Sequence, residues 1–239
     1  GNSGGGIGIA DSVSTVTTIN NSTITGNTTT LLGGGVRNGT GTMTINNSTI
    51  TNNTSSGAGG GIRNSGGTLT LTNTIGAGNT STNTSIDVSS ATVTASYNFI
   101  GTNGGNTIAN GTNGNQVGTN ATPLNPVLAP LANNGGKTQT HALQTGSPAI
   151  DKGRTQGTPG IAEILPKTST RIGKEYSAAA ALIPTATTDQ RGLTRPYDNP
   201  AIANAAGGDG ADIGAFEAQV ATAANASVSG RVITADGRG

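Results

Sequence analysis

Few residues in this sequence have side chains suited to catalysis, and the single histidine is the first of them. His141 precedes Ser147 and Asp151, so the three residue types of a serine-hydrolase relay lie close together in the chain. Such a relay needs its serine on a sharp, glycine-flanked turn between a strand and a helix. The residues around Ser147 lack that pattern. We therefore interpret His141 as a structural residue.

Carboxylates are the second candidate, because enzymes that cleave polysaccharides use paired acidic groups. Nine of the eleven acidic residues lie from Asp151 onward, and only Asp11 and Asp87 precede it. In the repeat described below these two lie about three turns apart, so they form no catalytic pair. We expect a protein that is not an enzyme, with a polysaccharide lyase or hydrolase as the remaining catalytic alternative.

A calcium site is the third candidate. Residues 207–212, Gly-Gly-Asp-Gly-Ala-Asp, match the first six positions of a calcium-binding nonapeptide. That motif works in tandem copies because successive turns share each ion. Here one copy is present, and Gly214 stands where a large apolar residue belongs. We interpret the stretch as a tight turn, retain calcium at Asp209 and Asp212 as the alternative, and expect no other cofactor.

Arg37 and Arg63 are the candidates for binding. They occupy equivalent positions of a repeat, 26 residues apart, and are therefore expected to stack on one outer face. Solvent or a small anion can satisfy the two guanidinium groups. The alternative ligand is a carboxylate, carried by a glycan or by a protein partner.

The composition excludes several classes of protein. The chain has 239 residues, of which 40 are Gly, 41 Thr and 26 Asn, while Ile, Leu, Val and Phe together number 42. A net charge of +1, with no Trp, is unlike a nucleic-acid binder. No apolar run is long enough for a membrane span. The low aliphatic content is compatible with disorder, but the low net charge is not typical of it.

A repeat decides between these readings. Residues 33–38, Gly-Gly-Gly-Val-Arg-Asn, recur as Gly-Gly-Gly-Ile-Arg-Asn at 59–64, and residues 18–25 recur unchanged at 44–51. A looser copy covers 70–75, and a fourth at 93–101 aligns Asn98 with Asn73. Apolar residues alternate with Thr inside each copy, which is the pattern of a β-strand. A turn of about 26 residues with three short strands predicts an all-β fold, a right-handed parallel β-helix.

In such a solenoid, residues 26 apart lie directly above each other. The predicted inward aliphatic stack is Ile19, Ile45 and Leu71. One predicted internal amide ladder, at a corner, is Asn21, Asn47 and Asn73. A second, at another corner, is Asn27, Asn53 and Asn79. Asn suits these corners because it tolerates a left-handed backbone.

The chain divides into three predicted regions. Residues 1–120 are the β-helix, and residues 121–217 are an irregular cap over its open end, with an inserted segment near 161–187 that holds a short helix. Proline and acidic residues mark this change. Residues 218–239 are a tail with a lone strand or hairpin. Its apolar and basic residues, expected to pair with an exposed edge of this chain or of a neighbour, are Val228, Arg231, Val232 and Ile233.

The second half of the chain carries a resemblance. Residues 125–138, 140–143 and 146–151, together with 189–192, Arg195-Pro196 and 212–217, resemble bacterial right-handed parallel β-helix surface proteins of the choice-of-anchor Q type. The tail resembles the start of a carboxypeptidase-regulatory-like β-sandwich that has been cut short. The resemblance implies an extracellular or cell-surface protein, commonly without an assigned activity. The sequence has no leader, so we expect a processed chain or a fragment.

Two functions remain. The first is a non-enzymatic structural protein of the cell exterior, a rigid rod that self-associates as a filament or surface-layer subunit, with the tail pairing with a neighbour. The second is a carbohydrate-binding or adhesive module that uses the Thr- and Asn-lined faces. The expected partners are therefore further copies of the chain or a cell-surface glycan.

Overall fold

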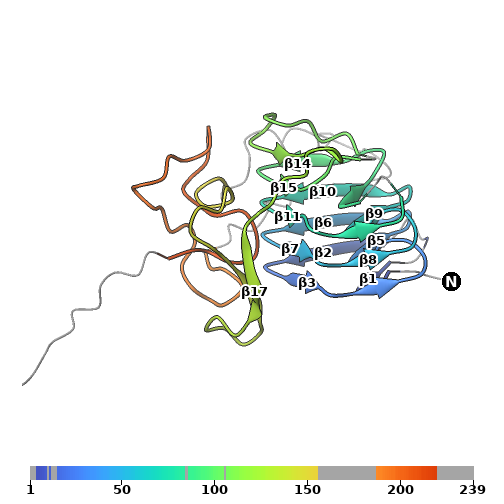
Figure 1. Cartoon of the computed structure of the whole chain (residues 1–239), viewed down its shortest axis with the longest axis horizontal. Helices are drawn as coiled ribbons and strands as arrows, with labels where there is room; N and C mark the ends of the chain where they lie inside the picture. Colours follow the sequence, from blue (N-terminus) through green and yellow to red (C-terminus); the bar gives the residue numbers. More distant parts are fainter. Residues whose placement is uncertain are drawn as a thin grey trace, which may run out of the picture.

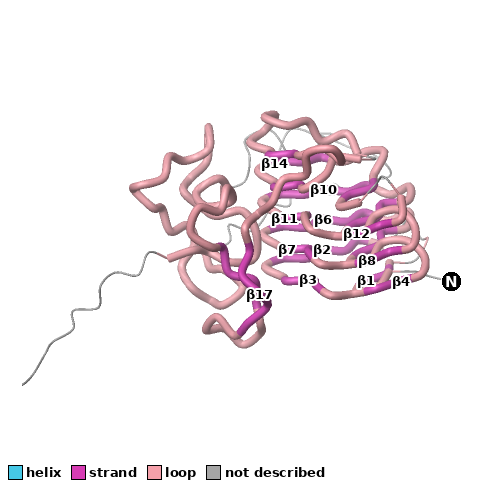
Figure 2. The backbone as a smooth tube through the Cα atoms, in the orientation of Figure 1, coloured by secondary structure: helices cyan, strands magenta, loops and turns pink. Residues whose placement is uncertain are grey.

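The computed structural model describes residues 4–9, 11, 15–83, 86–104, 106–155 and 187–219. These residues form short strands and no helix (Figure 2). The strands β1 to β16 stack in parallel as a β-solenoid, and β17 and β18 lie beside it (Figure 1). The fold is therefore all-β, as the repeat predicts.

Each full turn contributes one strand to each of four sheets. The first sheet is β1 (Ile7–Gly8), β5 (Val36–Asn38), β9 (Ile62–Asn64) and β13 (Val88–Ser89). The second is β2 (Val16–Asn20), β6 (Thr42–Asn46), β10 (Thr68–Thr72) and β14 (Thr94–Ser96). The third is β3 (Thr23–Thr25), β7 (Thr49–Thr51), β11 (Ile75–Gly76), β15 (Phe99–Ile100) and β16 (Gln116–Val117). The fourth is β4 (Thr28–Thr29), β8 (Thr54–Ser55) and β12 (Thr80–Ser81).

The prediction of three strands per turn is wrong. The residues that follow each glycine triplet, such as 36–38 and 62–64, form a strand of their own and pair in parallel. The triplets turn the chain just before these strands, since Gly33 and Gly59 have left-handed φ of 68° and 75°. The fourth strand arises because the first residue after the triplet is apolar and enters the core, as Val36 and Ile62 do.

The predicted aliphatic stack is confirmed. Ile19 pairs with Ile45 and Ile45 with Leu71, and all three are buried in one core cluster. Met43 and Leu69 extend that cluster from the neighbouring inward positions of β6 and β10. The core is only one side chain deep, because each strand sends alternate residues inward and the opposite sheet meets them directly.

The fourth repeat is shorter than the sequence alignment indicates. Leu71 pairs with Ala95 and Ile75 with Phe99, a shift of 24 residues. The equivalent of Asn73 is therefore Tyr97, and both have a left-handed backbone, with φ of 51° and 53°. The alignment of Asn98 with Asn73 is wrong by one position. It fails because the amide that it matches is not the corner residue.

One end of the solenoid is closed by the chain that follows β15. Residues 106–118 fold across this end, and Ile108 enters the core with 4% of its surface exposed. Asn106 Nδ2 donates to the Val88 carbonyl oxygen at 3.2 Å. Parallel pairing ends at β16, whose Val117 also lies in the core.

The residues beyond the solenoid, 121–155 and 187–219, are here called the lateral segment. They contain the antiparallel pair β17 (Leu128–Ala132) and β18 (Thr140–Leu143). The segment lies along the side of the stack, against the outer face of the third sheet (Figure 1). The prediction that this region caps the open end is wrong for its described residues. Ile75 and Phe99 point outward here and need a cover.

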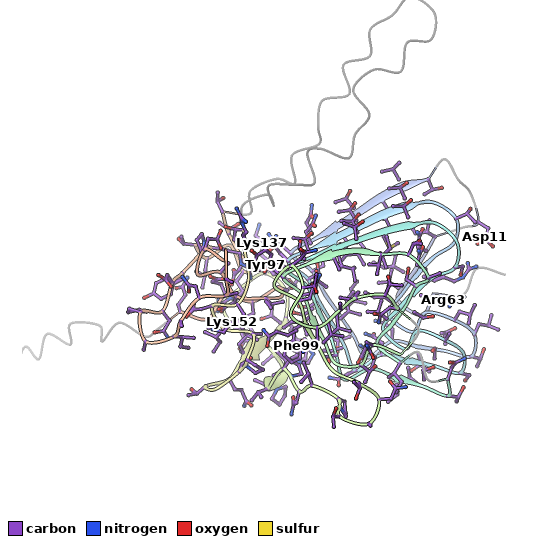
Figure 3. The ribbon with its side chains drawn as sticks, turned by 90° about the horizontal axis from the view of Figure 1, so that it is seen from above. Asp11, Arg63, Tyr97, Phe99, Lys137 and Lys152 are labelled. Atoms are coloured by element: carbon purple, nitrogen blue, oxygen red, sulfur yellow. The ribbon has the colours of Figure 1, made fainter. Side chains whose placement is uncertain are left out.

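A second hydrophobic core joins the lateral segment to the solenoid. Ile75, Ala77 and Phe99 of the third sheet pack against the lateral segment. Seen along the stack, Tyr97 and Phe99 lie on the side that faces the lateral segment, and Asp11 and Arg63 lie on the far side (Figure 3). The residues that the lateral segment contributes to this core are Leu143, Ala149, Ile150, Ile213 and Phe216.

Two sequence-based expectations lie outside the described residues. They are the inserted segment at 161–186 with its short helix, and the strand or hairpin of the tail. The tail residues concerned are Val228, Arg231, Val232 and Ile233.

Candidate functional site

The ladder of Asn27, Asn53 and Asn79 is confirmed as internal. The side-chain amide of Asn27 donates to Asn53 Oδ1 at 2.9 Å, and that of Asn53 donates to Asn79 Oδ1 at 3.0 Å. Asn53 Oδ1 also accepts from the backbone N–H of Asn27, and Asn79 Oδ1 from that of Asn53. The row continues to Asp87, which accepts from Asn79. The Asp87 carboxylate is therefore the last member of this amide ladder. The 26-residue period does not predict this, because Asp87 follows Asn79 by only 8 residues.

The ladder predicted for Asn21, Asn47 and Asn73 is not internal. Asn73 Nδ2 does bond to Asn47 Oδ1 at 2.8 Å, but it also donates to the Asp212 carbonyl oxygen of the lateral segment at 2.8 Å. Asn21 donates to the Thr188 carbonyl oxygen instead of to Asn47. The three residues have left-handed φ of 43° to 51°, which turns their side chains out of the core. Asn21 and Asn73 attach the lateral segment to the solenoid.

A third amide row was missed by the sequence reasoning. Asn38 Nδ2 donates to Asn64 Oδ1 at 2.8 Å, and Asn64 Nδ2 donates to Ser90 Oγ at 3.1 Å. Asn38 and Asn64 close the two copies of the glycine-triplet block, so the repeat itself carried the signal.

Arg37 and Arg63 do stack on the outer side of the first sheet, where they are register partners. Arg37 Nη2 lies 3.0 Å from Asp11 Oδ1, and Arg63 Nη1 donates to Ser89 Oγ at 2.5 Å. Arg37 is only 8% exposed, and its Nε and Nη1 have no hydrogen-bond partner. Each arginine of the stack therefore meets one acceptor of this chain, and Arg37 presents little guanidinium surface to a ligand.

His141, Ser147 and Asp151 form no relay. The ring nitrogens of His141 contact the Ala129 carbonyl oxygen at 2.8 Å and Thr25 Oγ1 at 3.1 Å. Ser147 Oγ donates to the Pro126 carbonyl oxygen, and Asp151 accepts from the Asn199 N–H. Each side chain thus fixes a different loop, and His141 joins β18 to the solenoid.

The two calcium candidates have separate protein partners. Asp209 accepts from the backbone N–H and the hydroxyl of Thr155. Asp212 accepts from the backbone N–H groups of Asp151 and Ala218. Among the described residues, no group of three or more acidic or histidine side chains is arranged to hold a metal ion. The carboxylates here act as caps for backbone donors.

Several charged residues of the lateral segment form one buried network. Arg195 Nε donates to Glu217 Oε2 at 2.8 Å, with both side chains fully buried. Glu217 also accepts from the N–H groups of Tyr197 and Asp212. Asp189 accepts from the Glu217 N–H and from Arg191. The guanidinium of Arg191 stacks on the Phe216 ring, 3.6 Å from its centroid.

Burial controls the protonation of this network. Desolvation raises the pKa of Glu217 to about 8, although the positive charge of Arg195 acts in the opposite direction. Desolvation likewise raises the pKa of Asp212 to about 7. Two carboxylates facing one guanidinium in a buried site favour retention of a proton. The residues that carry the family resemblance thus hold the lateral segment together, a role that sequence reasoning missed although the charges cluster there.

A groove runs along the solenoid between one of its corners and the lateral segment. It consists of two adjoining hollows of about 290 and 320 Å3 that share Gly78, Asn125 and Pro126. Successive turns supply one wall, from Thr51 to Thr102, and residues 123–130 supply the other. Polar amides and hydroxyls thus face proline and leucine side chains across a space that follows the stack.

No family model matches the chain, and neither a curated protein nor a solved structure matches it. In the part of the chain that the structure describes, no helix is long and apolar enough to cross a membrane. The chain is an all-β parallel solenoid with a lateral segment bound to its third sheet.

Proposed function

We propose that this protein is a non-enzymatic structural protein of the cell exterior, and that it pairs with a second copy through one open end of its solenoid. The observation that carries the proposal is the free edge of β1, β2, β3 and β4. These strands are the outermost members of their sheets, and no described residue pairs with their far side. An uncovered edge is a template for pairing with another strand.

The backbone of β2 shows which groups are available. The backbone groups of Thr15 and Asn21 bond to the next turn: the Thr15 carbonyl oxygen accepts from the Thr42 N–H, and the Asn21 N–H donates to the Asn46 carbonyl oxygen. Alternate residues of a parallel strand bond to opposite sides. Val16, Thr18 and Asn20 therefore direct their N–H and carbonyl groups to the open edge. Val16 is also 76% exposed, so its apolar side chain gains from being covered.

The two ends of the solenoid differ, which sets the expected stoichiometry. Residues 106–118 cover the opposite end, as Ile108 shows by its burial. One open end in each copy favours a closed pair over an extended filament. The cysteine-free composition is compatible with an exported protein.

A lysine at the edge tests this proposal, since charge on an edge strand opposes pairing. Sedimentation velocity over a range of concentrations is expected to show a dimer for the wild type and a monomer for Val16→Lys. The matched control is Leu131→Lys, which replaces an exposed apolar residue of β17, outside the solenoid. A monomeric wild type at the highest concentration, or equal behaviour of the two variants, would overturn the proposal.

A second candidate function is binding of a neutral glycan chain in the groove. It is supported by the pairing of an amide- and hydroxyl-lined wall with a proline- and leucine-lined one. Sugars present both polar edges and apolar faces, so a site with both kinds of wall suits them. The ionisable residues of the lining are Asp87 and His141, both already hydrogen-bonded, which favours a neutral ligand over a uronic acid.

Filling the groove tests this second candidate. Ala129 lines the hollow, and Ala132 lies on the same strand, exposed and outside it. On an array of neutral and acidic glycans, Ala129→Trp is expected to abolish binding of neutral chains, while Ala132→Trp retains it. Preference for acidic glycans, equal loss in both variants, or no wild-type binding would contradict the candidate.

A further inference from the structure

The outer face of the second sheet carries a regular array of threonines. Thr18 pairs in register with Thr44, Thr44 with Thr70, and Thr70 with Thr94. Two residues along each strand, Val16, Thr42 and Thr68 form a parallel row. We call this surface the Thr face and define it as Thr18, Thr42, Thr44, Thr68, Thr70 and Thr94.

The array has two fixed repeats. Adjacent strands of a sheet lie about 4.8 Å apart, and alternate residues of a strand lie about 6.6 Å apart. Inside, the register is held by the stack of Ile19, Ile45 and Leu71. Stacked identical side chains also reduce the twist of a sheet. The strands of this sheet lie evenly one above another (Figure 1), so the Thr face is a lattice in two dimensions.

Each threonine of the Thr face has the same chemistry. Threonine offers one methyl group and one hydroxyl group on a β-carbon, and its branching leaves it few rotamers. The four strands, with sequences VTTIN, TMTIN, TLTLT and TAS, contain no ionisable residue. Thr18, Thr42, Thr68 and Thr94 are exposed, and Thr44 and Thr70 are half-buried between them. The face is therefore neutral, stiff and accessible.

We propose that the Thr face binds ice. A crystal of water repeats its oxygen atoms in two dimensions, and the spacings of the Thr rows are close to those of the oxygen rows on a prism face of hexagonal ice. The hydroxyl groups join the lattice of hydrogen bonds at regular points, while the methyl groups occupy the spaces between them. A neutral surface suits this ligand, because a charged side chain orients water around itself and disturbs the lattice.

The other repeating solid of matching size is a crystalline polysaccharide. Planar sugar surfaces are bound by exposed aromatic faces, and the four strands of the Thr face contain no aromatic residue. The chain has no Trp, and the neighbouring Tyr97 and Phe99 are buried. The observations therefore favour ice. This inference does not depend on pairing through the open edge, since it uses a face and not an end of the solenoid.

Thermal hysteresis, the gap between the melting and freezing temperatures of a small ice crystal, tests the proposal. The full chain is expected to open this gap and to shape the crystal. Thr42→Lys with Thr68→Lys places two charges on exposed points of the Thr face and is expected to remove the gap. Thr42→Ser with Thr68→Ser keeps the hydroxyls but removes two methyl groups, and a smaller gap is expected.

The matched control is Thr54→Lys with Thr80→Lys. These exposed threonines lie in the same two turns but on the fourth sheet. The control is expected to keep the wild-type gap, and unchanged thermal unfolding of all variants shows that each is folded. The proposal is overturned by the absence of a gap in the wild type, by equal loss in the two lysine pairs, or by binding to crystalline cellulose or chitin with no effect on ice.

Discussion

Asn79 donates two hydrogen bonds to a single oxygen of Asp87: its backbone N–H lies 3.0 Å and its Nδ2 2.9 Å from Oδ1. The same pair of bonds links Asn53 to Asn79 one turn earlier. Along this row each Asn directs its backbone N–H and a side-chain N–H to Oδ1 of the next member, so the last member must supply an acceptor. A carboxylate is the side chain that fulfils this role, and its other oxygen accepts from Thr102.

Replacing Asp87 separates its geometry from its charge. Asp87→Ala removes the acceptor of two buried donors of Asn79, and each buried donor left without a partner costs about 1–3 kcal/mol. The free energy of unfolding measured in urea is therefore expected to fall by about 2–4 kcal/mol. Asp87→Asn keeps Oδ1 and is expected to cost under about 1 kcal/mol.

The pH dependence of stability is also expected to differ between the wild type and Asp87→Asn. Burial raises the pKa of Asp87, and the bonds from Asn79 and Thr102 offset this only in part. The folded state therefore holds the proton more tightly than the unfolded state, and the contribution of Asp87 to stability falls as pH rises through the raised pKa. This fall is expected to be absent in Asp87→Asn. Identical pH profiles for wild type and Asp87→Asn would contradict the assignment.

Asparagines of the two rows are expected to contribute different amounts to the free energy of unfolding. Asn53 is fully buried and its amide contacts the Ile24 and Thr51 carbonyl oxygens as well as Asn79. Asn21 makes one side-chain bond in an exposed position. Asn53→Ala is therefore expected to lower the free energy of unfolding by about 2 kcal/mol or more, and Asn21→Ala by about 0.5–1 kcal/mol. Equal losses in chemical denaturation would mean that the two ladders are alike.

The buried network predicts that stability depends on pH. Folding raises the pKa of Asp212 and Glu217 from their ordinary values of 3.8 and 4.5 to about 7 and about 8. Their contribution is fully present below about pH 4 and is lost as pH rises through 7 to 8. Glu217→Gln imitates the protonated form. In this variant the urea concentration at the midpoint of unfolding is expected to change less with pH between pH 5 and 9 than in the wild type. Asp11→Asn changes the net charge equally on an exposed residue and is the control.

Weakening the interface between the solenoid and the lateral segment is expected to detach the lateral segment without unfolding the solenoid. Phe99 is fully buried in the second core, and truncation of a buried Phe costs about 3–5 kcal/mol. Limited proteolysis of Phe99→Ala is expected to cut the lateral segment while leaving β1 to β15 intact. Ile45→Ala, in the solenoid core, is expected to expose the whole chain to cleavage. Simultaneous cleavage in both variants would show that the two parts unfold as one.

The repeat was sufficient to predict the parallel stack, the 26-residue register of its clearest copies and the inward aliphatic residues, but not the fourth strand of each turn. Ile19, Ile45 and Leu71 stack as expected because a fixed period places the same residue type at the same point of every turn. Asn27, Asn53 and Asn79 follow for the same reason. The alignment failed at Asn98, where the turn shortens by two residues and local similarity no longer identifies the corner.

The sequence alone therefore determined a stacked β-fold, because alternation and a constant period are local properties of the chain. Only the tertiary structure decided which way the corner residues Asn21, Asn47 and Asn73 face, since residue type indicates tolerance of a left-handed backbone but not the side to which the side chain points. The tertiary structure also decided that Ile75 and Phe99 point out of the solenoid and pack against the lateral segment. Bonds such as Asn73 to Asp212, 139 residues apart, depend on how the folded surfaces meet, and no periodicity encodes that meeting.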